Sequence, residues 1–187
     1  MNNPLAYYDL EKFLLEDVRG RFIEENSIGA FDLFSIIVWK SNRSKSKVAK
    51  RLMGKSTDSD LDKISRNISS DIAKAKTEKE KMKVLILDWG FKIAIASAIL
   101  TILYPDIFTI YDYRAAEQVG EGEKLKRKTK FEDIWSGYVE FRNKVAAVSH
   151  GGSLREKDHY LFGKSRMDDL TKDLKNEFAE NNKKGTS

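Results

Sequence analysis

The sequence predicts an all-α fold, built as a single compact helical domain over residues 1–187. Three observations support this prediction. Apolar residues recur at three- and four-residue spacing through most of the chain, which is the pattern of one face of an α-helix. Only two prolines, Pro4 and Pro105, interrupt the chain, so long helices are possible. A length of 187 residues with 41% hydrophobic residues is typical of one domain with its own core.

The first third of the chain is expected to hold three helices. An apolar stripe over residues 10–23 begins beside Asp9, an acidic residue that suits the positive end of a helix dipole. After a break, residues 31–39 form a strongly apolar second helix, which a polar tract ends. A short third helix covers residues 48–53, with Gly54 as its expected C-cap.

The middle of the chain predicts a helical hairpin. Thr57 or Asp58 is placed to cap a helix over residues 61–72, and the charged run that follows is compatible with a solvated helix face. Residues 84–87 close a helix, residues 88–90 turn the chain, and residues 93–103 supply a heavily buried helix that ends before Pro105.

The last third begins with a short extended linker at residues 107–111. Asp112 then stands where an N-cap is expected for a helix over residues 113–119. A basic loop over residues 120–130 leads to a helix over residues 131–148. Ser153 is the expected cap of the C-terminal helical region, which should fray over residues 176–187.

Composition limits the possible functions. The 34 lysines and arginines exceed the 29 acidic residues, for a net charge of +5, which is compatible with a polyanionic partner such as DNA. The absence of cysteine excludes disulfides, thiolate nucleophiles and iron–sulfur clusters. The two histidines show no ligand-spaced pattern, so we expect no metal and no cofactor. No secretory signal or membrane span is apparent, and we expect a cytoplasmic protein.

One segment carries a recognisable combination of residues. The turn Ile86-Leu87-Asp88-Trp89-Gly90 is followed by Lys92 two residues after the glycine, and by Asp112 at the start of a helix about twenty residues later. A helix rich in small residues lies between them. This region, about residues 79–120, resembles the helix-hairpin-helix DNA glycosylase superfamily, although Asp88 replaces the first glycine of the usual hairpin.

The resemblance implies both a binding surface and a reaction. The hairpin would hold a DNA phosphate through the backbone at Gly90 and Phe91. Asp112 would stabilise the positive charge that builds on the sugar as the base leaves. Lys92 would be the nucleophile that forms a Schiff base at C1′, provided that its amine is neutral.

Other residues complete the expected DNA site. Base chemistry in a duplex requires the target nucleotide to be flipped into a pocket with aromatic walls. The aromatic candidates for that pocket, or for a wedge, are Trp39, Trp89, Tyr111 and Tyr113. Basic residues that could meet phosphates, in addition to the hairpin, include Arg43, Lys45 and Arg114.

The leading hypothesis is therefore a DNA glycosylase that flips out and excises a damaged or modified base, with phage DNA as one source of such bases and antiviral defence as a role. The alternatives are a non-enzymatic helix-hairpin-helix DNA-binding module and a protein-interaction domain of a bacterial defence system. Residues 39–43 and 154–158 resemble patches in bacterial relatives of the superfamily, but no role follows for them. The excised base, the use of lyase chemistry, the preference for duplex or single strand and the oligomeric state stay open.

Overall fold

The computed structural model describes residues 4–122, 124–125 and 127–184, with side chains up to residue 176. All regular structure in this part of the chain is helical, which confirms the predicted all-α fold. The N-terminal elements are α1 (Pro4–Tyr8), α2 (Leu10–Phe13), the π-helical turn η1 (Leu14–Val18), α3 (Arg19–Glu25), α4 (Ala30–Ser41), the short 3-10 turn η2 (Asn42–Ser44) and α5 (Lys45–Lys55). They are followed by α6 (Leu61–Lys74), α7 (Glu78–Lys83), the π-helical turn η3 (Val84–Asp88), α8 (Ile93–Leu103), α9 (Tyr113–Gln118), α10 (Phe131–Ala146) and α11 (Leu154–Lys184).

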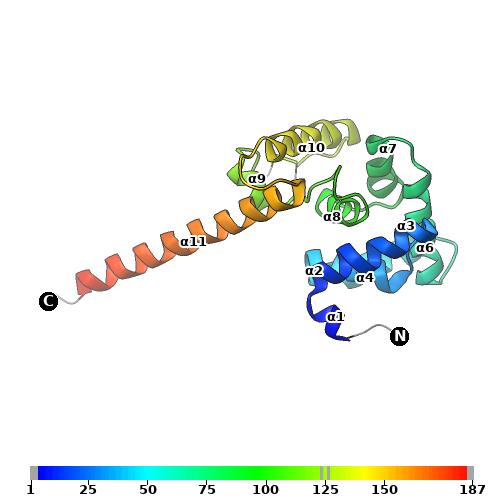
Figure 1. The fold of residues 1–187 in the computed structure, drawn as a ribbon, viewed down its shortest axis with the longest axis horizontal. Coiled ribbons are helices and arrows are strands. Elements are labelled where there is room, and N and C mark those ends of the chain that lie inside the picture. The colour runs from blue at the N-terminus through cyan, green and yellow to red at the C-terminus, as the bar shows by residue number, and fades with distance from the viewer. Residues whose placement is uncertain (1–3, 123, 126, 185–187) are drawn as a thin grey trace.

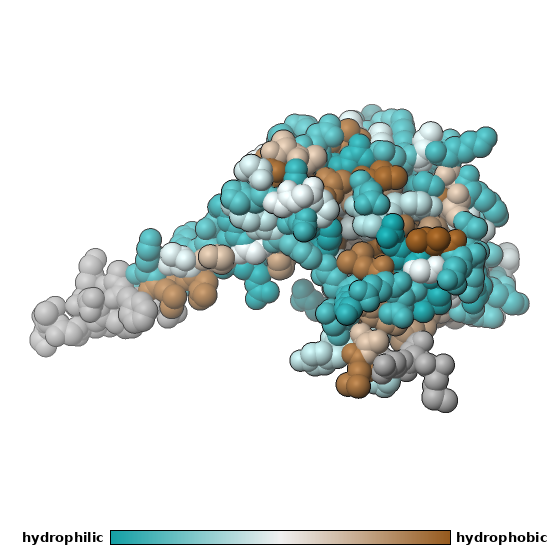
Figure 2. All heavy atoms as spheres, viewed as in Figure 1, coloured by the Kyte–Doolittle hydropathy of each residue, from teal (hydrophilic) through white to brown (hydrophobic). Residues whose placement is uncertain are grey.

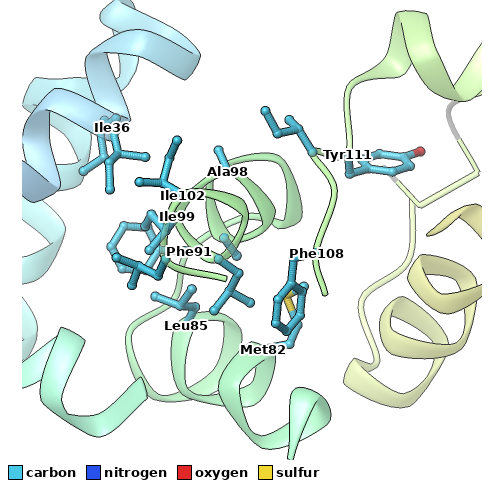
Figure 3. Packing of buried hydrophobic residues seen from close by; sticks show 14 of the residues in the cluster. Ile36, Met82, Leu85, Phe91, Ala98, Ile99, Ile102, Phe108 and Tyr111 are labelled. Carbon is cyan, nitrogen blue, oxygen red and sulfur yellow. The ribbon is translucent and has the colours of Figure 1, made fainter. Parts of the chain in front are cut away.

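Helix α8 lies at the centre of the fold. Every residue from Ala96 to Leu103 is buried, because the helix is covered on all sides by other elements. Figure 3 shows Ile99 and Ile102 of this helix facing Ile36 of α4, with Leu85 and Phe91 of the preceding hairpin beside them. The core joins the helices into a single compact domain, from which the C-terminal part of α11 projects (Figure 1).

Several helix ends differ from the sequence prediction. Gly54 lies inside α5, which continues to Lys55, so Gly54 is not its C-cap. The N-cap of α6 is Asp60 and neither Thr57 nor Asp58, because the carboxylate of Asp60 accepts a hydrogen bond of 2.8 Å from the amide of Asp62. The predicted N-cap of α9, Asp112, is confirmed.

The C-terminal helix extends through most of the segment that the sequence predicts to fray. Its backbone is helical to Lys184, and residues 185–187 lie outside the described part. Ser153 does cap this helix, since its hydroxyl accepts from the Glu156 amide at 3.2 Å. Within α11, Lys164 and Asp168 form an ion pair of 2.6 Å at a spacing that supports a solvated helix.

Helix α9 packs along the start of α11. At one end, Arg114 donates a hydrogen bond to Asp169, and at the other, Lys164 donates to the side-chain oxygen of Gln118 at 2.8 Å. The two helices are therefore joined at both ends of α9. None of the described helices combines the length and the apolar character that a membrane crossing requires.

Candidate functional site

Asp112 is held through both carboxylate oxygens. Its Oδ1 accepts a hydrogen bond from the Arg114 amide at 3.0 Å, as expected for the N-cap of α9. Its Oδ2 accepts a hydrogen bond from Nζ of Lys40, at the end of α4. The carboxylate is therefore fixed in direction, although 22% of the side chain stays exposed.

The segment that leads to Asp112 is anchored to the core. The Tyr138 hydroxyl donates to the carbonyl of Thr109 at 2.8 Å and accepts from its amide at 3.1 Å. Complete burial raises the pKa of Tyr138, so this hydroxyl stays protonated and keeps both bonds. The amide of Tyr111 donates to Oγ of Ser97 in α8 at 2.9 Å. These bonds satisfy the backbone of a segment that has no helix of its own.

A large cleft of about 680 Å³ opens on one side of Asp112. It lies between the end of α4, the start of α8, the segment that precedes α9, and the loop before α10. Its charged lining consists of Lys40, Lys92, Lys128 and Asp112, so positive charge prevails. Ile93 and Ala94 at the start of α8 also line it. The first amides of a helix have no acceptor within the helix and attract anions.

A smaller cleft of about 240 Å³ shares Lys40 and Asp112 with the large one, so this ion pair lies where the two clefts meet. Trp39, Ile110 and Phe162 give it apolar walls. Its remaining lining is charged or titratable, from the N-terminal region and from α11: Glu11, Arg155, Asp158 and His159. The small cleft thus combines aromatic surface with polar groups, as small-molecule sites do.

Asp158 is the most buried charged group in the small cleft. Burial raises its pKa to about 6, although the positive charges of Arg155, His159 and Lys40 act against the rise. Arg155 contacts the Asp158 carboxylate and donates from Nε to Glu11 at 2.8 Å. Its guanidinium also lies 5.1 Å from the centre of the Trp39 ring, within the range of a cation–π contact.

The structure thus brings together residues of two segments, 39–43 and 154–158, that stand out in the sequence as patches without a role as a whole. Trp39 and Lys40 come from residues 39–43, and Arg155 and Asp158 come from residues 154–158. All four lie in the small cleft with Asp112. Sequence reasoning missed Lys40 and Asp158 as site residues. The only signal for Lys40 was a lysine at the end of an apolar helix, beside Trp39, and its separation from Asp112 by 72 positions hid the contact.

The hairpin before α8 is supported by α5. Gly90 has a φ of +71°, a left-handed conformation that favours glycine. Nη1 of Arg51 donates to the Gly90 carbonyl at 2.7 Å, and Nζ of Lys55 donates to the Asp88 carbonyl at 3.0 Å. The positive charge of Lys55 thus lies beside Asp88, the residue that replaces the first glycine of the usual helix-hairpin-helix turn. The Phe91 amide donates to the Leu85 carbonyl at 2.8 Å, so this amide is already used within the hairpin.

Lys92 and Asp112 line the same large cleft. Lys92 is the N-cap of α8 and its side chain is exposed, whereas a neutral lysine amine requires a desolvated setting. Lys40, and not Lys92, makes the direct contact with Asp112. The large cleft therefore contains both Lys40 and Lys92, which come from different elements.

The other predicted site residues are divided among several places. Tyr113 is exposed in the large cleft, whereas Tyr111 is buried beside it and its hydroxyl donates to the Gly122 carbonyl at 2.8 Å. Trp89 packs partly against the core and lines neither cleft. The remaining basic candidates lie outside the clefts, with Arg114 paired to Asp169 and with Arg43 and Lys45 exposed on η2 and α5.

The described residues contain no group of three or more histidine, aspartate or glutamate side chains arranged to hold a metal ion. Comparison with protein-family models, with curated proteins and with solved structures finds no match for this chain.

Proposed function

We propose that this protein is a DNA glycosylase in which Asp112 stabilises the transition state of base excision. The observation that carries the proposal is the position of Asp112 between the large cleft, in which positive charge prevails, and the small cleft, which has aromatic walls. A nucleotide whose backbone lies in the first cleft and whose base enters the second would have its sugar beside this carboxylate.

The charge of the large cleft supports DNA as the ligand. Lys40, Lys92 and Lys128 supply positive charge, and the start of α8 supplies backbone amides. Helix α5 adds a basic surface without an acidic residue, next to the hairpin that it supports. Exposed basic residues of this kind bind phosphates without reading sequence. DNA would therefore lie across α5, the hairpin and the large cleft.

The small cleft fits a flipped base. A cavity of about 150 Å³ can hold benzene, so a cleft of about 240 Å³ has room for a nucleobase. Trp39 and Phe162 offer aromatic walls, and Arg155 and Asp158 offer hydrogen-bonding groups at its polar end. Of the aromatic residues predicted from sequence, Trp39 is thus the one suited to contact the base, while Tyr113 is placed to contact the strand.

The reaction follows from the charges around Asp112. As the C1′–N bond breaks, its electron pair leaves with the base and the sugar becomes positive, so a fixed carboxylate lowers the barrier. Water then adds to C1′, and the proton that it loses goes to the released base, which has taken the electron pair of the C1′–N bond. The Arg114 amide and Lys40 hold the carboxylate in one orientation before the substrate arrives. Lys92 is the proposed alternative nucleophile at C1′, which would form a Schiff base and allow strand cleavage.

The proposed substrate is DNA with a damaged or modified base, including the modified bases of phage DNA, which would give the protein a role in antiviral defence in the cytoplasm. The charged groups of the small cleft favour a base with polar substituents. Asp158 and Arg155 already pair with each other, and a base with polar substituents could form further hydrogen bonds with them that a purely apolar ligand could not.

A non-enzymatic DNA-binding module is the second candidate. Two observations favour it: each carboxylate oxygen of Asp112 already accepts a hydrogen bond, and the Lys92 side chain is exposed. In that case the Lys40–Asp112 ion pair would stabilise the fold and would have no catalytic role. The basic surface of α5 would then bind DNA with strong salt dependence and without turnover.

The deciding experiment compares Asp112→Asn with Asp60→Asn. Both aspartates cap a helix through the amide two residues later, and asparagine caps as well as aspartate, so both variants should fold. Abasic, damaged and phage-modified duplexes are incubated with each protein, and free base and strand breaks are measured. We expect Asp112→Asn to lower base release about a hundredfold or more, and Asp60→Asn to leave it unchanged. Base release at the wild-type rate by Asp112→Asn would refute the catalytic role, and DNA binding without release would support the binding module.

A further inference from the structure

Helix α11 carries a second apolar face that the fold leaves uncovered. The face toward the body of the protein contains Asp158, Leu161 and Ser165, which are all buried. At about 100° per residue, the opposite face contains Gly163, Met167, Leu170 and Leu174. The exposed fractions of Met167, Leu170 and Leu174 are 71%, 59% and 45%. In Figure 2, hydrophobic side chains are visible on the underside of this projecting helix, next to the grey terminal residues.

This face has the spacing of a helix-pairing surface. Met167, Leu170 and Leu174 are separated by three and four residues, which is the alternation of the core positions in a coiled coil. A helix that extends from the body with little tertiary contact is marginal in water unless its apolar face is buried. We therefore expect a partner to cover this apolar stripe on the projecting part of α11.

We infer that the partner is a second copy of this chain, paired through α11 in an antiparallel arrangement. When Met167 is placed opposite Leu170 of the second copy, the same register places Leu174 opposite Gly163. Apart from the adjacent residues and the nearby backbone of its own helix, Gly163 has no atom within 4 Å of the place where a Cβ would stand. A glycine in the middle of a helix is unfavourable by itself, and here it makes room for the larger leucine. Two-fold symmetry then repeats each contact.

Charge on one flank of the stripe selects the antiparallel direction. In this register Arg166 of each copy lies beside Asp173 of the other, so two ion pairs form symmetrically. Neither residue forms an ion pair with another of the described side chains, although the Arg166 guanidinium lies 5.9 Å from the Phe162 ring centre. In a parallel pair Arg166 would instead lie beside Thr171, and Asp173 would gain no cation. The apolar stripe and the charges thus both favour the antiparallel dimer. This inference does not depend on the proposed enzymatic function.

The first test measures mass against protein concentration by light scattering or sedimentation. The wild-type chain should change from monomer to dimer as its concentration rises. Leu170→Asp should raise the dissociation constant by at least about tenfold, since it removes a central apolar contact from both copies. Thr171→Asp, which places the same charge on the neighbouring residue outside the apolar stripe, is the matched control and should have a smaller effect. A wild-type protein that stays monomeric at every concentration would overturn the inference and leave the stripe to a different protein.

The second test determines direction. Arg166→Asp alone should weaken the dimer, and the double variant Arg166→Asp with Asp173→Arg should restore it. Because the chain has no cysteine, Arg166→Cys and Asp173→Cys can be introduced as single thiols and mixed under oxidising conditions. Antiparallel pairing predicts a disulfide between the two different variants and little of either variant with itself. A crosslink of each variant with itself would refute the register.

Discussion

The ammonium of Lys40 donates a hydrogen bond to Oδ2 of Asp112, 72 positions later, at the point where the basic cleft meets the small aromatic cleft. The lysine comes from the end of α4 and the aspartate from the start of α9, so the contact joins the N-terminal helices to the C-terminal ones. Because Lys40 contacts Asp112 and Lys92 does not, we expect substitutions of these two lysines to affect the proposed reaction differently.

Lys40→Gln and Lys92→Gln should affect different steps. Loss of Lys40 frees Oδ2 of Asp112, and we expect base release to fall about a hundredfold because the carboxylate is no longer oriented. Lys92→Gln should leave base release in place, because water is the nucleophile of the main reaction, and it should abolish the borohydride-trapped adduct that Lys92 would form with the abasic product. The two assays are run on the same abasic and modified duplexes. Trapping by Lys92→Gln at the wild-type level would remove Lys92 as the nucleophile.

Asp158 should make stability fall as the pH rises through its titration range. Burial raises the pKa of this carboxyl from 3.8 to about 6, so between these values the folded state binds more proton than the unfolded state. The stabilisation is therefore complete below the lower value and is lost as the pH passes the higher one. Relative to Asp158→Asn, wild type should lose on the order of 2 kcal/mol of unfolding free energy from pH 4 to 7 in urea titrations. Parallel pH curves for the two proteins would contradict this.

Gly90→Ala and Gly54→Ala should have opposite effects on stability. Gly90 has a positive φ, and a Cβ there would meet the Arg51 side chain at 3.4 Å, so we expect a loss of about 1–2 kcal/mol. Gly54 lies inside α5 with open space around it, so alanine there should gain about 0.5–1 kcal/mol. Urea unfolding of both variants measures the difference. A neutral Gly90→Ala would mean that the hairpin adopts another conformation in solution.

Tyr138→Phe should destabilise the whole domain. The hydroxyl is buried and satisfies both the amide and the carbonyl of Thr109, so its removal leaves two buried backbone groups without partners. The expected cost is about 1–3 kcal/mol of unfolding free energy. Tyr160→Phe on the exposed side of α11 is the control, and its effect should stay within about 0.5 kcal/mol. Equal midpoints for the two variants in thermal unfolding would show that Thr109 finds other partners.

Local patterns made most of the helices predictable. The apolar run that ends at Pro105 corresponds to α8, Ile93–Leu103, because a helix that is apolar on every side must lie at the centre of the core. The N-cap role of Asp112 followed from residue type and position alone. The prediction that Gly54 is a C-cap is wrong, because the sequence alone does not distinguish a glycine inside a solvated helix from a glycine that ends one. Asp58 and Asp60 are two residues apart, and nothing local decides which of them caps α6.

The site was only partly predictable. Asp112 and Lys92 belong to one local motif, and they do line one cleft. The contribution of Lys40 and Asp158 depends on how α4 and α11 pack, and a contact between segments so distant in the chain leaves no periodic signal. The segments that contain these two residues nevertheless stand out in the sequence as patches, and the fold gives them a common location around Asp112.

The attachment of α9 to α11 has one more consequence. Asp112 begins α9, while Arg114 and Gln118 bind the long helix at Asp169 and Lys164. The carboxylate therefore lies at the start of a short helix whose side-chain contacts are with α11. These contacts are close to the apolar stripe where a second copy would bind. We therefore expect a tilt of α11 relative to α4 to change the distance between the Asp112 carboxylate and the Lys40 ammonium.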